Sequence, residues 1–308
     1  MIAYNYNIPE AMVSLGLFYL LGKGVAQNEH EAVSLFEKAA VQNNADGQFF
    51  TGLCYKDGLG VQQCFKNAAV LFEKSAKQGS PEAQNELGEC YEYGKGVEQD
   101  YFQAVKWYRR AAKQGLRAAQ CNLGFCYERG HGVEKDCKKA VRLYTLSAKQ
   151  GYAEAQCILG YCYDSGCGVK RDCKKAVFRY QKAAAQGDTV ARFNLGNCYR
   201  TGEGVAQDEK KAARLYRLAA KDGYIPALHN LGNCYYYGVG VKINYKKAAE
   251  FYSISAEADN HSLFMLGECY EYGRGVKKNQ DEAVKCYSKA AEQGNKEAKK
   301  ALARLGKL

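Results

Sequence analysis

The stretch NELGECYEYGKGVEQD, residues 85–100, decides the fold because close copies of it recur along the chain. The copies read CNLGFCYERGHGVEKD from Cys121, CILGYCYDSGCGVKRD from Cys157 and FNLGNCYRTGEGVAQD from Phe193. A feature that is present in every copy is more typical of a scaffold than of an active site. Aligning the central glycines gives eight repeats, spaced by 36 residues and once by 35: Gly16, Gly52, Gly88, Gly124, Gly160, Gly196, Gly232 and Gly267.

Each repeat predicts two helices joined by a glycine turn. In the third repeat, Ala83, Leu87, Cys90 and Tyr91 fall at i, i+4, i+7 and i+8, which places them on one apolar stripe of a helix. Gly88 lies beside this stripe and has no side chain, so we expect another helix to approach closely there. The second helix carries a similar stripe of Ala104, Tyr108, Ala111 and Ala112.

The turn residues mark where these helices begin and end. Gly94 and Gly96 end the first helix by allowing unusual backbone angles, and Asp100 lies where an N-cap would accept the free amides of the second. Gly115 then ends the second helix.

No single hairpin buries its apolar stripe alone, so the repeats must stack, which predicts an all-α, right-handed α-solenoid (superhelix). We expect one domain over residues 1–308, with a C-terminal capping helix at 295–308. The apolar run at 11–22 falls in phase with the repeats, and no Lys or Arg precedes it, so it predicts the first helix rather than an export signal or membrane span. The expected repeats are 8–43, 44–79, 80–115, 116–151, 152–187, 188–223, 224–259 and 260–294.

The segment AQNELGECYEYGKGVEQDYFQAVKWYRRAAKQG, which begins at Ala83, resembles the Sel-1-like repeat (SLR) family, and the resemblance covers nearly the whole chain. Tetratricopeptide repeats share the architecture, but they run at about 34 residues and usually end on a proline that is missing here. The resemblance implies a non-enzymatic adaptor or scaffold for protein complexes. Relatives act in processes as varied as quality control, cell-wall regulation and bacterial signalling, so the process stays open.

Seven of the fourteen cysteines form one column, each followed by Tyr. Equivalent helices in neighbouring repeats lie roughly 8 to 10 Å apart, beyond the about 7 Å limit for a disulfide. We therefore expect buried thiols and a cytoplasmic or other reducing compartment. The column consists of Cys54, Cys90, Cys126, Cys162, Cys198, Cys234 and Cys269.

Enzymatic alternatives have weaker support. One secreted, cysteine-rich SLR branch with lactamase-like activity staples each repeat with a cysteine pair at the junction, but Cys121 has no such partner on the preceding helix. The Gly-x-Gly pairs lack the preceding strand and the Lys-Ser/Thr of a phosphate loop. The chain has no C-x-x-C and its four histidines are scattered, so we expect no metal and no cofactor.

Positive charge is concentrated in the middle of the chain. The net charge of +11 divides into −6 over residues 1–100, +13 over 101–223 and +4 over the remainder. Many cations lie on second helices and predict a solvated outer face. An acidic partner or a nucleic acid is the alternative, although no nucleic-acid motif supports the latter. One repeat phase holds Lys139, Lys175, Lys211 and Lys247.

The candidate partner-binding surface is the concave groove lined by first helices, because side chains opposite the apolar stripe vary from repeat to repeat. We expect a monomer that binds a protein or peptide there, with Phe125, Tyr161 and Phe193 as aromatic anchors. The other predicted contact residues are Glu89, Glu92, Asn197, Arg200, His229, Asn233 and Tyr236.

Overall fold

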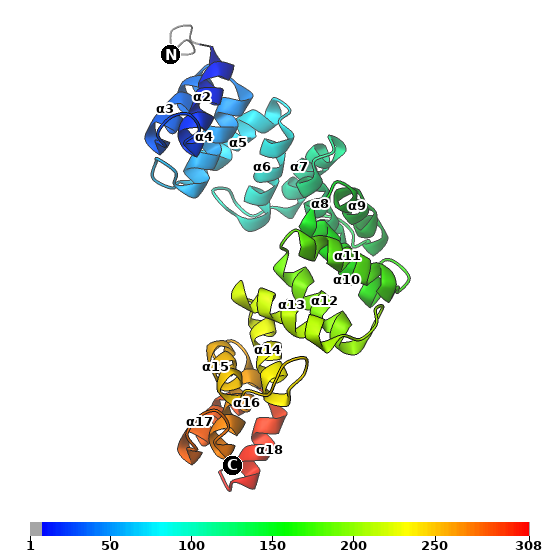
Figure 1. The fold of residues 1–308 in the computed structure, drawn as a ribbon. Coiled ribbons are helices and arrows are strands. Elements are labelled where there is room, and N and C mark those ends of the chain that lie inside the picture. The colour runs from blue at the N-terminus through cyan, green and yellow to red at the C-terminus, as the bar shows by residue number, and fades with distance from the viewer. Residues whose placement is uncertain (1–7, 308) are drawn as a thin grey trace. The chain divides into compact units, whose positions relative to one another are not determined.

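The computed structural model describes residues 8–307, and within that range it contains seventeen α-helices and no strand (Figure 1). The predicted all-α solenoid of helical hairpins is confirmed. The first helices of the repeats are α2 (Pro9–Leu21), α4 (Ala45–Asp57), α6 (Pro81–Tyr93), α8 (Arg117–Arg129), α10 (Ala153–Ser165), α12 (Thr189–Thr201), α14 (Ile225–Tyr237) and α16 (Asn260–Tyr272). The second helices are α3 (Glu29–Val41), α5 (Phe65–Lys77), α7 (Tyr101–Lys113), α9 (Cys137–Lys149), α11 (Cys173–Ala185), α13 (Glu209–Lys221), α15 (Tyr245–Ser255) and α17 (Gln280–Glu292), and α18 (Lys296–Arg304) follows them.

The local chemistry of the turn between α6 and α7 agrees with the sequence pattern. The carboxylate of Asp100 accepts hydrogen bonds from the backbone N–H groups of Phe102 (2.8 Å) and Gln103 (3.1 Å), which are otherwise unpaired at a helix start. Gly94 ends α6 in the left-handed region with φ 66°, a conformation that costs a glycine little. The turn is therefore a structural device.

A glycine on each first helix receives an aromatic ring from the second helix of the same repeat. A Cβ built on Gly88 would lie 2.6 Å from the ring of Tyr108, so no other residue fits without displacement. The close approach predicted at Gly88 is therefore made by this ring. The rings at this repeat position are all fully buried: Phe36, Phe72, Tyr108, Tyr144, Tyr180, Tyr216, Tyr252 and Tyr287.

Within each unit the repeats stack because second helices also pack on the first helix of the next repeat, as α3 does on α4 and α13 does on α14. The chain divides between Ala155 and Gln156 into two compact units, the N-terminal unit and the C-terminal unit, and each is described by itself below. Within the N-terminal unit, the turn glycine Gly96 packs directly on the backbone carbonyl of Phe65 in the preceding repeat. Backbone contact of this kind fixes the spacing between hairpins.

Glutamine side chains tie neighbouring elements together, a feature that the sequence analysis did not predict. The side-chain amide of Gln114 donates to Gln84 (2.9 Å) and to the backbone carbonyl of Gly79 (3.1 Å). Because Gln84 is only 4% exposed, its oxygen needs a protein donor to replace water. The same bridge joins Gln78 to Gln48 (2.8 Å), Gln150 to Gln120 (2.9 Å) and Gln186 to Gln156 (2.9 Å).

Helix α18 packs on α17 at the end of the C-terminal unit. Its Arg304 forms an ion pair with Glu271 at 2.7 Å, and Glu271 also accepts a hydrogen bond from the hydroxyl of Tyr287 at 2.7 Å. Across residues 8–307, no helix combines the length and apolarity required to cross a membrane.

Candidate functional site

In each unit, the first-helix surface is the set of solvent-facing side chains on the first helices: α6 and α8 in the N-terminal unit, and Tyr161 of α10 with α12, α14 and α16 in the C-terminal unit. Most of the predicted partner-binding residues lie on it. In the N-terminal unit, Asn85 donates to Glu89 at 2.8 Å, and Asn122 on α8 donates to Asn85 (3.1 Å) and Glu89 (3.3 Å). Burial, reinforced by the nearby carboxylate of Glu86, raises the pKa of Glu89. Glu89 is thus a partly desolvated acceptor in a polar network that joins α6 to α8.

Several predicted contact residues also hold the buried tyrosines. The hydroxyl of Tyr108 donates to Glu92 at 2.6 Å, and that of Tyr216 donates to Asn197 at 2.7 Å. Arg200 donates from Nε to the Tyr216 oxygen at 3.3 Å. These residues therefore stabilise the core as well as facing solvent, because a buried hydroxyl without a partner is costly.

The three predicted anchors differ in exposure. Phe125 on α8 is half-buried and packs edge-on against Tyr144, with ring centroids 5.9 Å apart. Phe193 on α12 is half-buried and packs against Tyr224 at 5.2 Å. Tyr161 on α10 is 53% exposed. Phe125 lies in the N-terminal unit and the other two in the C-terminal unit. Their role in binding remains a prediction.

A polar cluster surrounds His229 in the C-terminal unit. The Tyr252 hydroxyl donates to Asn233 Oδ1 at 2.7 Å, so Asn233 Nδ2 faces His229 Nε2 at 2.9 Å and donates to it. His229 therefore carries its proton on Nδ1, which lies 2.9 Å from Ser262 Oγ and 3.1 Å from Asp259 Oδ2. Burial lowers the pKa of His229 and favours the neutral imidazole.

This Ser-His-Asp cluster is not arranged as a hydrolase triad. Ser262 is fully buried and donates from Oγ to Asp259 Oδ2 at 2.6 Å, so its oxygen is directed at a carboxylate that also caps α16. A nucleophilic serine instead needs an exposed oxygen hydrogen-bonded to the histidine that takes its proton. The cluster fits a structural role that positions His229 and Asn233.

The C-terminal cavity, with a volume of about 540 Å³, lies between α14, α16 and α18. His229 and Asn233 line it together with the exposed side chains of Tyr237 and His261 and the half-buried Phe264. It thus combines rings with hydrogen-bonding groups, the usual character of a ligand pocket. Sequence reasoning named His229 and Asn233 but not the other three residues.

Tyr236 differs from its predicted place on the exposed surface. Its side chain is 4% exposed and packs edge-on against Tyr245 at 5.3 Å, while Arg274 donates a hydrogen bond to its hydroxyl. The exposed ring in this part of α14 is the neighbouring Tyr237, which is 60% exposed. Successive residues of an α-helix point in different directions. Tyr237 therefore points to solvent, while Tyr236 packs against the second helix of its own repeat.

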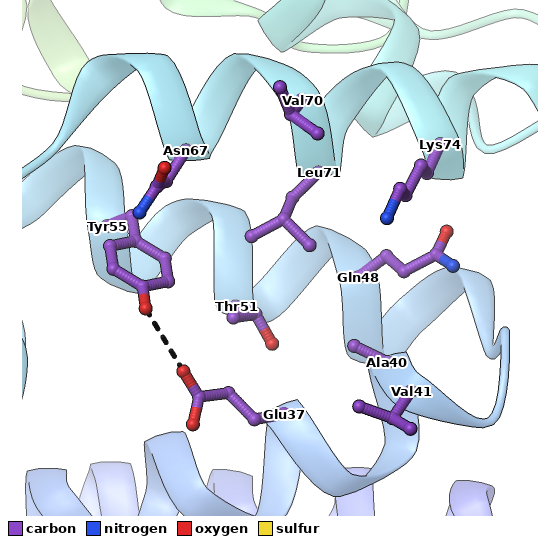
Figure 2. Close-up of a pocket in the computed structure, with 10 residues that line it drawn as sticks. All are labelled: Glu37, Ala40, Val41, Gln48, Thr51, Tyr55, Asn67, Val70, Leu71 and Lys74. Atoms are coloured by element: carbon purple, nitrogen blue, oxygen red, sulfur yellow. Dashed lines mark hydrogen bonds between the residues drawn. The ribbon is translucent and has the colours of Figure 1, made fainter.

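A further cavity, of about 420 Å³, lies on the second-helix side of the N-terminal unit, between α3, α4 and α5 (Figure 2). Leu71 and Val41 contribute apolar lining, and Lys74 stands across from Glu37, which accepts a hydrogen bond from the hydroxyl of Tyr55 at 3.2 Å (Figure 2). The sequence analysis did not predict this cavity.

A model of the Sel1 repeat matches the chain eight times without interruption, over residues 9–44, 45–80, 81–116, 117–152, 153–188, 189–224, 225–260 and 261–295. The chain belongs to the Sel1 repeat family. The resemblance noted in the sequence is thereby confirmed. No curated protein matches the chain.

Solved structures of Sel1 repeat proteins are similar to this chain. A protective antigen of uropathogenic Escherichia coli that displays an SLR fold is 33% identical, with a TM-score of 0.83 over 98% of this chain. This chain spans 65% of the length of that antigen. A Sel1 repeat protein from Oxalobacter formigenes is 28% identical, with a TM-score of 0.70, and the match covers 98% of this chain and 88% of the other.

The Sel1 repeats keep their column cysteines inside the fold. Cys54, Cys90 and Cys126 are buried free thiols, and burial raises the pKa of Cys126 from 9.0 to about 12. A thiol in this state is a poor nucleophile. The column therefore serves packing, as its repetition indicates.

The lysines at one phase of the Sel1 repeat already have local partners. Lys139 pairs with the N-cap carboxylate of Asp136 at 3.2 Å and lies 5.5 Å from the centre of the Tyr127 ring. Lys211 repeats this arrangement with Asp208 at 3.2 Å and Tyr199 at 5.3 Å. Much of this positive charge is thus partly compensated within the repeat.

Among residues 8–307, one group of side chains comes close enough to hold a metal ion, and it consists of Asp164, Cys173 and Glu203. Glu203 is exposed and faces Arg171 at 3.4 Å, so a cation would compete with an existing ion pair. With one sulfur, no imidazole and open solvent nearby, the group has little of the character of a zinc site.

Proposed function

We propose that this Sel1 repeat protein is a non-enzymatic scaffold that binds a protein or peptide through its first-helix surface. The C-terminal cavity carries the proposal, because predicted contact residues line it together with exposed rings and polar groups. Tyr237 and His261 are 60% and 73% exposed, respectively, so they can contact a ligand without unfolding. Exposed aromatic side chains beside a preformed pocket are typical anchors of protein interfaces.

The test is affinity capture with matched variants. The purified chain is used to capture partners from an extract, and the captured protein is then expressed alone and its affinity measured. Tyr237→Ala combined with His261→Ala should weaken binding at least about tenfold, since truncated aromatic hot spots commonly cost that much. Ile254→Ala is the matched control, because Ile254 is 60% exposed on the second helix α15 of the same unit.

Two outcomes would contradict the proposal. Equal loss of affinity in the control and in the double variant would show that the first-helix surface is not the binding site. Turnover of a chromogenic β-lactam by the purified chain would instead support the lactamase-like alternative.

The proposed compartment is reducing, such as the cytoplasm, and the support is the burial of cysteines without disulfides, as at Cys54 and Cys90. Trapping thiols with a maleimide during lysis tests this. After denaturation the chain isolated from its own cells should take up label at every cysteine, whereas protection by disulfides would contradict the assignment.

A further inference from the structure

The α11–α13 groove is a cavity of about 340 Å³ on the second-helix side of the C-terminal unit, with α12 beneath it. Its apolar lining includes the buried Leu195, the half-buried Leu215 and Leu218, which is 39% exposed at the rim. Because second helices form its walls, it is separate from the first-helix surface. A binding role here is independent of the proposed function.

The equivalent positions of other repeats indicate which side chain would fit this groove. In the third repeat, the position equivalent to Leu215 is Trp107, which is 5% exposed and packs into the core of its unit. The guanidinium of Arg110 stacks on this tryptophan at 4.6 Å from the ring centre. An indole with a cation over it therefore fills, in α7, the space that Leu215 leaves open in α13.

The seventh repeat fills the same position with another ring. Phe251 replaces Leu215 there and stacks on Tyr235 with centroids 5.9 Å apart. The residue equivalent to Tyr235 in the α11–α13 groove is Tyr199, which also lines the cavity. A ring inserted by a partner would thus find a tyrosine wall of the kind that already stacks on Phe251.

The charge of the groove indicates the rest of the ligand. Lys211 and Arg214 line it, and no carboxylate does. Helices α11 and α13 together carry nine Lys and Arg residues against a single carboxylate, Glu209. Lys211 is partly compensated by Asp208, whereas Arg214 is exposed and has no ion pair with any residue in the range 8–307. Such a surface attracts and orients an acidic partner.

The equivalent cavity of the N-terminal unit lacks this charge. There Glu37 stands in place of Gln181 and Val70 in place of Arg214, so a carboxylate lines this cavity together with a single lysine, Lys74 (Figure 2). The two cavities occupy equivalent places in their repeats but differ in charge and in two lining residues, since Thr51 and Lys74 stand where the α11–α13 groove has Leu195 and Leu218, so the N-terminal one serves as an internal control.

We propose that the α11–α13 groove binds an acidic peptide segment of a partner protein that inserts one aromatic side chain. The inserted ring lies between Leu195, Leu215 and Leu218, as Trp107 does within its own unit, and carboxylates flanking it pair with Arg214 and Lys211. A nucleic acid would satisfy the charge but would leave the aliphatic lining without an apolar occupant, which is why we favour a peptide.

The experiment uses the full chain and a short fluorescein-labelled peptide with one tryptophan flanked by glutamates, followed by fluorescence anisotropy near physiological ionic strength. Leu215→Trp should weaken binding at least about tenfold by filling the groove from within, and Arg214→Glu should weaken it similarly. Leu71→Trp fills the N-terminal cavity and should leave the affinity unchanged. If Leu215→Trp fails to fold, judged by circular dichroism, Leu218→Glu at the rim replaces it.

Peptide variants separate specific insertion from charge attraction. Replacing the peptide tryptophan with alanine should abolish measurable binding, and replacing its glutamates with lysines should do the same. The proposal is overturned if the wild-type chain does not bind the peptide, if the alanine peptide binds equally well, or if Leu71→Trp weakens binding as much as Leu215→Trp. A single-stranded oligonucleotide that binds more tightly and displaces the peptide would overturn it in favour of nucleic acid.

Discussion

The first two repeats differ from the later ones in the aromatic ring that packs against the glycine of the first helix. Phe36 and Phe72 fill the space beside the first-helix glycine in repeats one and two, whereas tyrosines such as Tyr108 fill it from the third repeat onward. The tyrosine hydroxyl reaches the first-helix surface, where Glu92 accepts from it at 2.6 Å. A phenylalanine has no hydroxyl, so it needs no hydrogen-bond acceptor on that surface.

The surface residue changes with the ring. At the position of Glu92, the second repeat has Lys56, which pairs with Glu86 at 2.8 Å instead of serving a hydroxyl. The first repeat has Leu20 there. The first-helix surface supplies a hydrogen-bond acceptor to most of the buried tyrosines, from the position of Glu92 or, as Asn197 does for Tyr216, from the position of Glu89. A phenylalanine needs no acceptor.

The largest expected effect on stability concerns the first-helix glycine, which both regions share. A Cβ on Gly52 would lie 2.6 Å from the Phe72 ring, and one on Gly124 would lie 2.6 Å from the Tyr144 ring. Gly52→Val and Gly124→Val should each lower the free energy of unfolding by roughly 1 to 3 kcal/mol, because a buried ring must move. Urea unfolding followed by circular dichroism measures the loss.

Lys106→Val is the control for these glycine variants, because Lys106 is an exposed residue inside α7. It introduces the same β-branched side chain into a helix without a clash and should cost less than about 0.7 kcal/mol. If Gly124→Val cost no more than the control, the ring would not limit the approach of the two helices.

An intermediate effect distinguishes the two regions. Phe72→Tyr should destabilise the chain by about 1 to 3 kcal/mol, because it buries a hydroxyl donor opposite Lys56, which offers no acceptor. Adding Lys56→Gln supplies an acceptor and should recover part of that loss. In the later repeats Tyr108→Phe should cost only about 0.5 to 1.5 kcal/mol, the net value of one hydrogen bond.

A double-mutant cycle on positions 56 and 72 measures this coupling directly. The comparison between the two regions is contradicted if Phe72→Tyr and Tyr108→Phe have equal effects and the cycle shows no coupling. Water at the inserted hydroxyl would then have replaced the protein acceptor.

The sequence predicted the fold in detail because the same pattern of apolar, glycine and N-cap residues recurs in the repeats. Asp100 at the N-cap and Gly94 at the helix end follow from local chemistry, and recurrence of the pattern eight times removes ambiguity about helix or strand. The partners of buried polar groups could not be predicted in the same way. The hydroxyl of Tyr216 on α13 donates to Asn197 on α12 because of how these two helices pack, and no local sequence pattern predicts this hydrogen bond.

The candidate site was predicted less completely for a related reason. Exposure of a helical residue near the end of its helix depends on the next element, so the predicted Tyr236 is buried and its neighbour Tyr237 is exposed instead. The α11–α13 groove could have been predicted in part, since Leu215 stands where other repeats have Trp107 or Phe251. The signal lies in one position compared across the repeats, not in the face that a residue occupies on its own helix.

The smallest expected effect on stability concerns the predicted anchors. Tyr161→Ala should change the free energy of unfolding by less than about 0.5 kcal/mol, because the side chain is 53% exposed and such surface substitutions are usually nearly neutral. Phe193→Ala should cost more, since it removes a half-buried ring that packs against Tyr216 at 5.9 Å and Tyr224 at 5.2 Å. Phe125→Ala should behave like Phe193→Ala, because Phe125 packs on Tyr144 in the same way.

Partner affinity then separates a binding anchor from a packing residue. If Tyr161 contacts the ligand, Tyr161→Ala should weaken binding of the captured partner by about tenfold or more while leaving the urea midpoint unchanged. In Phe193→Ala, partner affinity and the urea midpoint should both decrease. Phe193 packs against the buried Tyr216, so its loss disturbs the core and thereby the surface residues that the core positions. Unchanged affinity in Tyr161→Ala would remove this residue from the binding surface, and Tyr237 and His261 at the C-terminal cavity would then be the anchors that remain.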